Sequence, residues 1–261
     1  MTQARREAVS AEAHEPLASC AVYRLGSTEF RYRIEDGEAT IAFCESEAKH
    51  LAMPETLGCA PVTAIGDNAF SDLAGISSAT MPACLRTIGA QAFARCLNLR
   101  NIDVGQSLES IGEGAFRGCS RLTSLAFPET LSHIGSSALS NTAIARVDIP
   151  AACTSIDADA LCTGPSFPGS IGLAYASSLT AITVSPGNPA YCVEGGALCR
   201  KLPGGNLEAV LCTGGADAVS LSPRVERVLA STFAGTRAIG HLRVSESTVF
   251  PDERPPLPNG S

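Results

Sequence analysis

The sequence predicts a solenoid that is formally α/β but leans to mostly β, a curved right-handed stack of short strands and turns with a parallel sheet. Two observations carry this prediction: self-similarity at a period of about 23 residues and a short apolar alternation within each period. A stack grows by adding units, so a chain of 261 residues needs no single large core.

A six-residue motif marks the repeat. Ile-Gly is followed two residues later by Ala-Phe at 65–70, 88–93 and 111–116, and each copy begins 23 residues after the last. A fourth copy begins at Ile134 and a fifth begins 22 residues later at Ile156, both with Leu in place of Phe. The motif is interpreted as a turn that lays one small and one large apolar residue inward, and the two Leu units are expected to stack more loosely.

Between the motifs, each unit carries a short apolar alternation that predicts a strand. In the second unit, Ile102 and Val104 alternate with polar residues. A period of two is typical of a strand with one buried face. Proline follows this alternation at Pro82, Pro128 and Pro150 and ends the strand, because it has no N–H to donate. One unit cannot bury its apolar side alone, so we expect neighbouring units to stack with their strands parallel.

The units resemble the BspA-like, or Treponema-pallidum-type, bacterial leucine-rich repeat. The hallmark of that family reads Ile-Gly-x-x-Ala-Phe-x-x-Cys-x-x-Leu-x-x-Ile-x-Ile-Pro. Residues 111–128 match it almost completely, with Cys119 in the cysteine position, and 88–104 match it with Gly105 where the family has Pro. The resemblance spans residues 51–246 and implies a leucine-rich-repeat solenoid.

The ends and insertions are predicted from turn residues. Alternating residues on both sides of an Asp-Gly turn at 36–37 indicate a β-hairpin cap, and Gly-Gly-Asn at 204–206 indicates a turn between strands at 194–198 and 207–211. This second hairpin resembles an inserted unit of the family. The expected segments are 1–27 (disordered or linker N-terminus, with 1–19 disordered), 28–250 (leucine-rich-repeat domain) and 251–261 (Pro-rich tail). Within the domain they are 28–50 (cap), 51–184 (repeats, with a loop insertion at 162–178), 185–220 (hairpin insertion) and 221–246 (final repeat, from Val228).

Composition and charge argue against several classes of protein. The net charge is −7 and no Lys/Arg-rich run occurs, so no nucleic-acid partner is predicted. No apolar run of about 18 residues occurs, so no membrane span is predicted. Residues 1–17 are polar and lack the apolar stretch of a signal peptide, so export is not predicted from the chain as given, although an upstream segment would change that expectation.

No catalytic, metal or cofactor site is predicted, and the chain is expected not to be an enzyme. No metalloprotease, P-loop or nucleophile-elbow motif occurs. The glycine pairs at 195–196 and 214–215 open no predicted helix, so they are interpreted as turns. The histidines are scattered: His14, His50, His133 and His241.

The eleven cysteines are interpreted as small buried apolar residues. Cys96 and Cys119 share one slot in adjacent units and should lie about 5 Å apart, within reach of a disulfide. In a ladder, however, parallel side chains are expected to stack without bonding. An oxidising compartment would favour disulfides, and whether any of the eleven pair stays open.

The exposed face of the aligned strands is the candidate binding surface, since solenoids present such a face to their ligands. Its residues are small and polar, without the aromatic anchors of many interfaces, so a plain solvated face is an equal alternative. Bulging outward, the 162–178 loop is a second candidate. The exposed positions proposed for binding are Ser78, Thr80, Asn101, Asp103, Ser124, Arg146, Asp148, Thr183, His241 and Arg243.

The resemblance implies a non-enzymatic protein-interaction module at the cell surface or outside the cell, with a role in adhesion or ligand binding. The expected partner is a protein or a glycan of unknown identity. The alternative is an intracellular, cytoplasmic scaffold or regulatory leucine-rich-repeat protein, with which unpaired cysteines agree.

Overall fold

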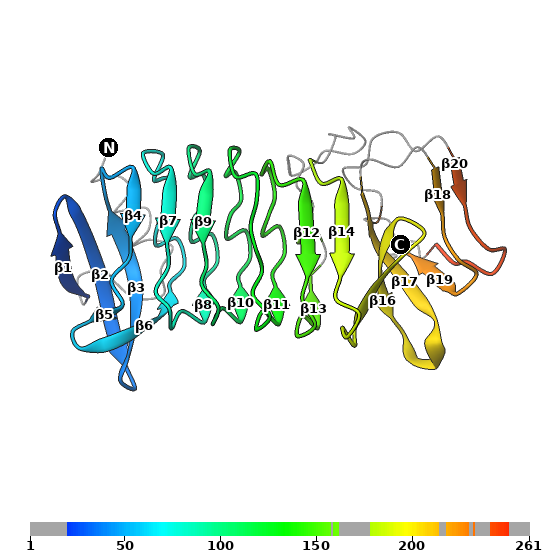
Figure 1. The fold of residues 1–261 in the computed structure, drawn as a ribbon, viewed down its shortest axis with the longest axis horizontal. Helices are drawn as coiled ribbons and strands as arrows, with labels where there is room; N and C mark the ends of the chain where they lie inside the picture. The colour runs from blue at the N-terminus through cyan, green and yellow to red at the C-terminus, as the bar shows by residue number, and fades with distance from the viewer. Residues whose placement is uncertain are drawn as a thin grey trace, which may run out of the picture.

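The computed structural model describes residues 20–157, 159–161, 178–213, 218–229, 232 and 241–250. Figure 1 shows an elongated stack along which the chain advances unit by unit. Apart from a short 3-10 turn, η2 (Pro203–Gly205), the regular elements of these residues are all strands, and many of them pair in parallel. The predicted mostly β repeat solenoid is therefore confirmed. The tail at 251–261 and nearly all of the 162–178 insertion lie outside the described residues.

An antiparallel sheet begins the stack. Strands β1 (Ala21–Leu25), β2 (Thr28–Glu35) and β3 (Glu38–Glu45) pair in sequence order. The predicted turn between β2 and β3 has positive φ at Asp36 and Gly37. The expectation of a linker up to residue 27 is wrong for β1, because a turn at Gly26 (φ 60°) lets the chain fold back onto β2. Residues 1–19, expected to be disordered, lie outside the described part.

The longest ladder runs through the Ile-Gly motif. β3 pairs in parallel with β6 (Ala60–Ile65), and each motif isoleucine then pairs with the next. The motif therefore begins as a two-residue strand and turns only after its glycine, whereas the sequence predicted a turn throughout. The further strands of this ladder are β8 (Thr87–Ile88), β10 (Ser110–Ile111), β11 (His133–Ile134) and β13 (Ser155–Ile156), and β5 (Thr56–Leu57) pairs with β6.

A second set of parallel strands comes from the apolar alternations. Figure 1 shows it along the upper part of the stack, with β8, β10, β11 and β13 along the lower part. It is divided in two at residues 122–128, which have no strand assignment. The division coincides with a shorter fourth unit, since Ile134 precedes the buried Val147 by 13 residues and Ile111 precedes Leu125 by 14. Its strands are β4 (His50–Ala52), β7 (Ser78–Thr80) and β9 (Asn101–Asp103), then β12 (Arg146–Ile149) and β14 (Ala181–Val184).

The C-terminal part contains a hairpin and a small sheet. β15 (Tyr191–Glu194) and β16 (Ala197–Lys201) turn at residues 195–196, so the prediction of one strand across 194–198 is wrong. A Cβ on Gly195 would lie 2.1 Å from the Ser220 carbonyl oxygen, so only glycine fits this turn. The turn before residue 207 is as predicted. The remaining strands are β17 (Leu207–Cys212), β18 (Ala218–Ser220), β19 (Val225–Val228) and β20 (His241–Arg243).

A column of equivalent side chains forms the core. The fully buried rings of Phe70 and Phe93 stack at 4.9 Å, and those of Phe93 and Phe116 at 5.6 Å. Leu139 and Leu161 continue the column and are also buried, so burial gives no sign of the looser packing that was expected there. Each unit thus covers the apolar side of the next.

Neighbouring units approach so closely at the motif glycine that no side chain fits. A Cβ on Gly112 would lie 2.7 Å from the Ala90 nitrogen and from the Gly89 carbonyl carbon, both backbone atoms of the preceding unit. Gly89 and Gly135 have equivalent contacts. The Gly112 N–H donates to the Ile88 carbonyl at 2.8 Å. This glycine therefore sets the distance between units.

We predict that Gly112→Ala lowers the free energy of unfolding by about 1–3 kcal/mol, because the methyl group forces the backbones apart. Urea denaturation followed by circular dichroism measures this change. Gly75→Ala is the matched control, since a Cβ there meets nothing within 4 Å and we expect a change within about 0.5 kcal/mol. Equal effects of the two substitutions would contradict the close-approach explanation.

A second backbone constraint recurs three residues after each motif isoleucine. In the five units that begin at Ile65, Ile88, Ile111, Ile134 and Ile156, this position has left-handed φ although most of its residues carry a side chain: Asn68 (57°), Gln91 (53°), Gly114 (57°), Ser137 (54°) and Asp159 (57°). The left-handed conformation costs an L-residue about 1–2 kcal/mol, part of which glycine avoids.

We therefore predict that Gln91→Gly raises the free energy of unfolding by about 0.5–1 kcal/mol, and that Gly114→Ala lowers it by a similar amount. Thermal or urea unfolding of the two variants provides the measurement. Opposite signs are the diagnostic result, and a loss of stability in both variants would count against this account.

Candidate binding face

Parallel pairing of β7 with β9 brings four of the predicted positions together. Ser78 pairs with Asn101, and Thr80 pairs with Asp103. The side chains of Thr80, Asn101 and Asp103 are exposed and that of Ser78 is half-buried, while Ala79 between them is buried. These residues therefore form two adjacent rows on one surface, as predicted.

The face begins one strand earlier than expected. β4 pairs with β7, so His50 lies beside Ser78 and extends the row. The His50 Nδ1 and the Ser78 Oγ are 2.7 Å apart. The sequence analysis missed His50 because it assigned residue 50 to the cap. The alternation of His50, the apolar Leu51 and Ala52 could have predicted a strand with His50 on its exposed side.

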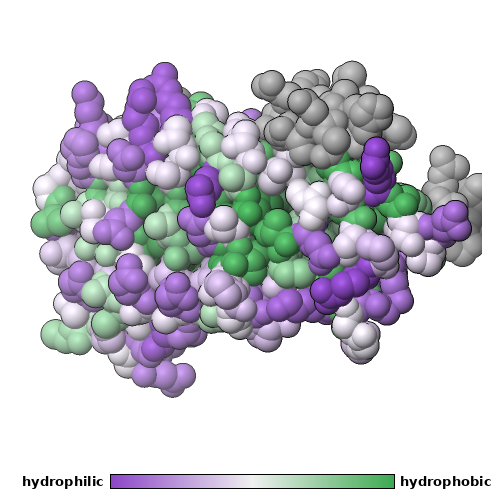
Figure 2. Space-filling model, turned by 45° about the vertical axis from the view of Figure 1, so that its right-hand side comes forward, coloured by the Kyte–Doolittle hydropathy of each residue, from purple (hydrophilic) through white to green (hydrophobic). Residues whose placement is uncertain are grey.

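A second segment of the face lies on β12 and β14. Arg146 pairs with Ala181 and Asp148 pairs with Thr183, so three predicted positions meet there. Ser124 is exposed but lies in the stretch without strand pairing. Figure 2 shows a band of hydrophobic residues along the middle of this side of the molecule, with hydrophilic residues above and below it.

The last two predicted positions are not part of this face. His241 and Arg243 lie on β20, which pairs only with β18 in a separate sheet of the described residues. Strands β15, β16, β17 and β19 intervene between β14 and this sheet, as Figure 1 shows. The sequence register of the final unit is preserved, but the inserted hairpin displaces its strand from the row.

The Asp148 carboxylate is held by two neighbouring side chains of the face. The Thr183 hydroxyl donates to its Oδ1, and the Arg146 Nε–H donates to the same oxygen at 3.2 Å. The hydrogen bond from Thr183, followed by the interactions with Arg146, holds the pKa of Asp148 below its usual value. The Asp148 carboxylate is therefore ionised at neutral pH, and it is more than half exposed to solvent.

A groove of about 290 Å³ opens beside Asp148. It lies where β12 and β14 end and is closed on one side by residues 127–129. Its walls include the half-buried Phe127 and Val184, and its rim includes the exposed Glu129. The groove combines apolar walls with two carboxylates.

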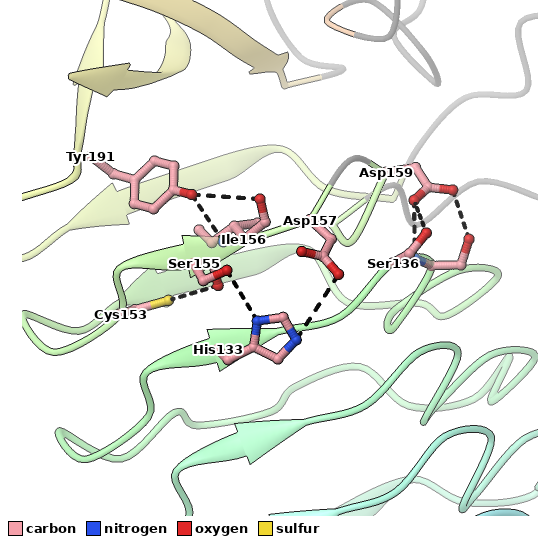
Figure 3. A network of polar contacts seen from close by, with 9 residues as sticks. His133, Ser136, Cys153, Ser155, Ile156, Asp157, Asp159 and Tyr191 are labelled. Atoms are coloured by element: carbon pink, nitrogen blue, oxygen red, sulfur yellow. Dashed lines mark hydrogen bonds and ion pairs between the residues drawn. The ribbon is translucent and has the colours of Figure 1, made fainter. Parts of the chain in front are cut away.

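The polar network in Figure 3 lies on the other ladder, where the hairpin meets the repeats. His133 Nδ1 lies 3.1 Å from Ser155 Oγ, and its Nε2 lies 4.0 Å from an Asp157 oxygen. The second distance exceeds hydrogen-bonding range, and His133 and Ser155 are paired neighbours on β11 and β13. We interpret this arrangement as cross-strand pairing and not as a nucleophile with its base.

Two further contacts in Figure 3 join the units. The Asp159 carboxylate accepts hydrogen bonds at 2.7 Å from the hydroxyls of Ser136 and Ser137. The buried Tyr191 hydroxyl accepts the Ile156 N–H at 2.9 Å. The Asp159 bonds join the fourth and fifth units, and the Tyr191 bond joins the last strand of the ladder to β15.

The residues in the cysteine position of the repeat motif are buried, and their thiols form hydrogen bonds in the core. The thiols of Cys96 and Cys119 donate to the carbonyls of Phe70 and Phe93, each at 3.1 Å, as expected for stacked side chains without a bridge. Burial raises the pKa of Cys153 to about 11 and that of Cys199 to about 12. These last two thiols are therefore protonated and poorly nucleophilic at neutral pH.

Two other kinds of site were searched for in the described ranges. Those ranges hold no group of three or more His, Cys, Asp or Glu side chains suited to a metal ion. Among the same residues, no helix is long and apolar enough to cross a membrane.

Comparison with known proteins supports the repeat assignment. Residues 39–165 match, in six copies, the family model described as "BspA type Leucine rich repeat region". No curated protein matches the chain.

Three similar solved structures are leucine-rich-repeat proteins or share their fold. The T. pallidum leucine-rich repeat protein is 19% identical with a TM-score of 0.56, covering 85% of this chain and 82% of that one. A leucine-rich-repeat protein from Bacteroides ovatus is 18% identical with a TM-score of 0.59, covering 87% of this chain but 54% of that one. The pneumococcal vaccine antigen PcpA is 16% identical with a TM-score of 0.58, covering 87% and 71%. At these identities the likeness concerns the fold.

We predict that Thr183→Val raises the pKa of Asp148 towards its usual value, and that Arg146→Gln raises it less, because Thr183 provides the larger stabilisation of the carboxylate. A carboxyl-carbon NMR titration of Asp148 measures both. Since the folded-state pKa is lowered, the interaction stabilises the fold above the unfolded-state pKa and is lost as the pH falls through the folded-state value. A larger shift in Arg146→Gln would contradict the assignment.

Proposed function

Residues 39–165 of this chain are a BspA-type leucine-rich repeat region, and we propose that the chain is a non-enzymatic protein-interaction module that binds a protein ligand on the face of β7, β9, β12 and β14. Repeat folds of this kind present aligned strands as binding surfaces. The observation that carries the proposal is the parallel register, which places exposed side chains of successive units side by side.

The composition of the face supports a protein ligand. Thr80, Asn101 and Thr183 are small, so a partner chain can approach the strands closely, and their side chains offer hydrogen bonds. Hydroxyl, amide and carboxylate groups combined with apolar surface suit the mixed chemistry of a protein interface.

The finer proposal is adhesion or ligand binding at a cell surface. It is supported by the family resemblance and by the shared fold with PcpA, which is described as a vaccine antigen. The alternative is an intracellular scaffold or regulatory protein. It is favoured by cysteines such as Cys119, Cys153 and Cys199, which form no disulfide in the described part of the chain. Fractionation of cells expressing the native protein decides between them: recovery with the envelope supports adhesion, and recovery in the cytoplasm supports the alternative.

We predict that a photo-crosslinking residue at Thr80 or Thr183 captures a protein ligand, whereas the same residue at Thr87, exposed on the lower ladder, does not. The double variant Asp103→Arg/Asp148→Arg should weaken affinity for the captured protein roughly tenfold or more, because it reverses two charges on the face. Mass spectrometry identifies the product, and titration of the purified pair measures affinity.

The control for the double variant is Glu109→Arg, which reverses one exposed charge next to the lower ladder. Equal capture from Thr87, or affinity unaffected by the double variant, would move the binding surface elsewhere. Capture of a glycan in place of a protein would overturn the proposed ligand class while leaving the face in place.

A further inference from the structure

We infer that the groove beside Asp148 is a pocket for a single lysine or arginine side chain of the protein partner. This inference rests on the proposed function and names the chemistry that the partner presents to one part of the face.

The size of the groove fits one side chain. Its volume of about 290 Å³ is at the lower limit of the range of about 300–1,000 Å³ usual for small-molecule and cofactor sites, and it has room for one long side chain. The buried Ile149 and Pro150 form part of its lining, and Phe127 and Val184 are half-buried beside them. These walls suit the methylene stem of a long side chain.

The charge of the groove selects a cation. Asp148 uses Oδ1 for both Thr183 and Arg146, and no other partner of its carboxylate is found among the described residues, which leaves Oδ2 for a ligand. Glu129 is exposed at the rim, and its carboxylate also has no partner within the described part of the chain. Two carboxylates therefore belong to the lining of the groove, and their negative charge disfavours an anionic ligand.

Among the described residues, Arg146 is the cation that contacts Asp148. Its contact is with Oδ1 from the same strand, two residues before Asp148, and it is not among the residues that line the groove. Even with Arg146 counted, the two carboxylates leave the rim with a net negative charge. An entering guanidinium or ammonium group can bind Asp148 Oδ2 and Glu129 through charge-assisted hydrogen bonds.

The aromatic ring adds a second kind of selectivity. Phe127 lies in the same lining as the two carboxylates, so a cation bound there is also close to an aromatic ring. Such contacts favour a cation over a neutral group of the same shape. Lysine and arginine combine an apolar stem with a cationic head, and among protein side chains they match both features of the groove.

The test uses the full chain and two blocked amino acids as probes. Nα-acetyl-arginine amide and its neutral analogue Nα-acetyl-citrulline amide are titrated while the backbone amide signals are followed by NMR. We expect the arginine probe to shift the signals of Phe127, Thr183 and Val184, with a dissociation constant roughly fivefold or more below that of the citrulline probe. Nα-acetyl-lysine amide should give the same pattern of shifts.

Two variants make the result specific. Glu129→Gln/Asp148→Asn should weaken binding of the arginine probe roughly fivefold or more, whereas Glu109→Gln, which removes an exposed carboxylate next to the lower ladder and outside the groove, should leave it unchanged. An unchanged melting temperature shows that the double variant is folded. Equal binding of the citrulline probe, shifts located elsewhere, or undiminished binding by the double variant would overturn the inference.

The outcome separates this inference from the proposed function. If the arginine probe fails to bind but photo-crosslinks still form from Thr80 and Thr183, the face binds a protein and only the basic-side-chain pocket is wrong. If the probe binds as expected and no protein is captured on the face, the pocket stands as a cation site and the proposed function is wrong.

Discussion

The distance between repeat units is set by the backbone contact at the glycine of the Ile-Gly motif. Gly89, Gly112 and Gly135 lie against the preceding turn, where a Cβ would come within 2.8 Å of backbone atoms. Each also donates an N–H to the isoleucine carbonyl of the unit before it. The spacing set there brings the phenylalanine rings into stacking distance and keeps the strands in register. The core and the exposed face both depend on that register.

The exposed face follows the register and ends where the register is lost. Thr80 meets Asp103, and Asp148 meets Thr183, because the strands of adjacent units pair residue by residue. Residues 122–128 form no strand, so the pairing between adjacent units is interrupted there. After β14 the inserted hairpin begins a separate sheet. The face is therefore two segments with Ser124 between them. The groove beside Asp148 lies at the edge of the second segment, where Phe127 borders β12 and β14.

The chemistry of the other side chains agrees with a binding role. The Cys153 and Cys199 thiols have raised pKa values because they are buried, and His133 is engaged in pairing between neighbouring strands. Asp148, in contrast, is ionised and retains an oxygen for a ligand beside apolar walls. Fixed charge on a rigid strand face favours recognition of a partner, because little has to reorganise when the partner binds.

The sequence alone determined the repeat, its period, the buried column and most of the exposed row, because each follows from local spacing. The ladder was predictable from the 23-residue spacing of Ile65, Ile88 and Ile111. The stacking of Cys96 and Cys119 without a disulfide was also predicted correctly. Only the tertiary structure decided that the motif begins as a strand, that His50 joins the row, and that His241 and Arg243 leave it. It also decided that Phe127, Asp148 and Val184 enclose one groove. These features depend on pairing between distant segments, and a one-residue change in unit length or an inserted hairpin alters that pairing without changing the local pattern.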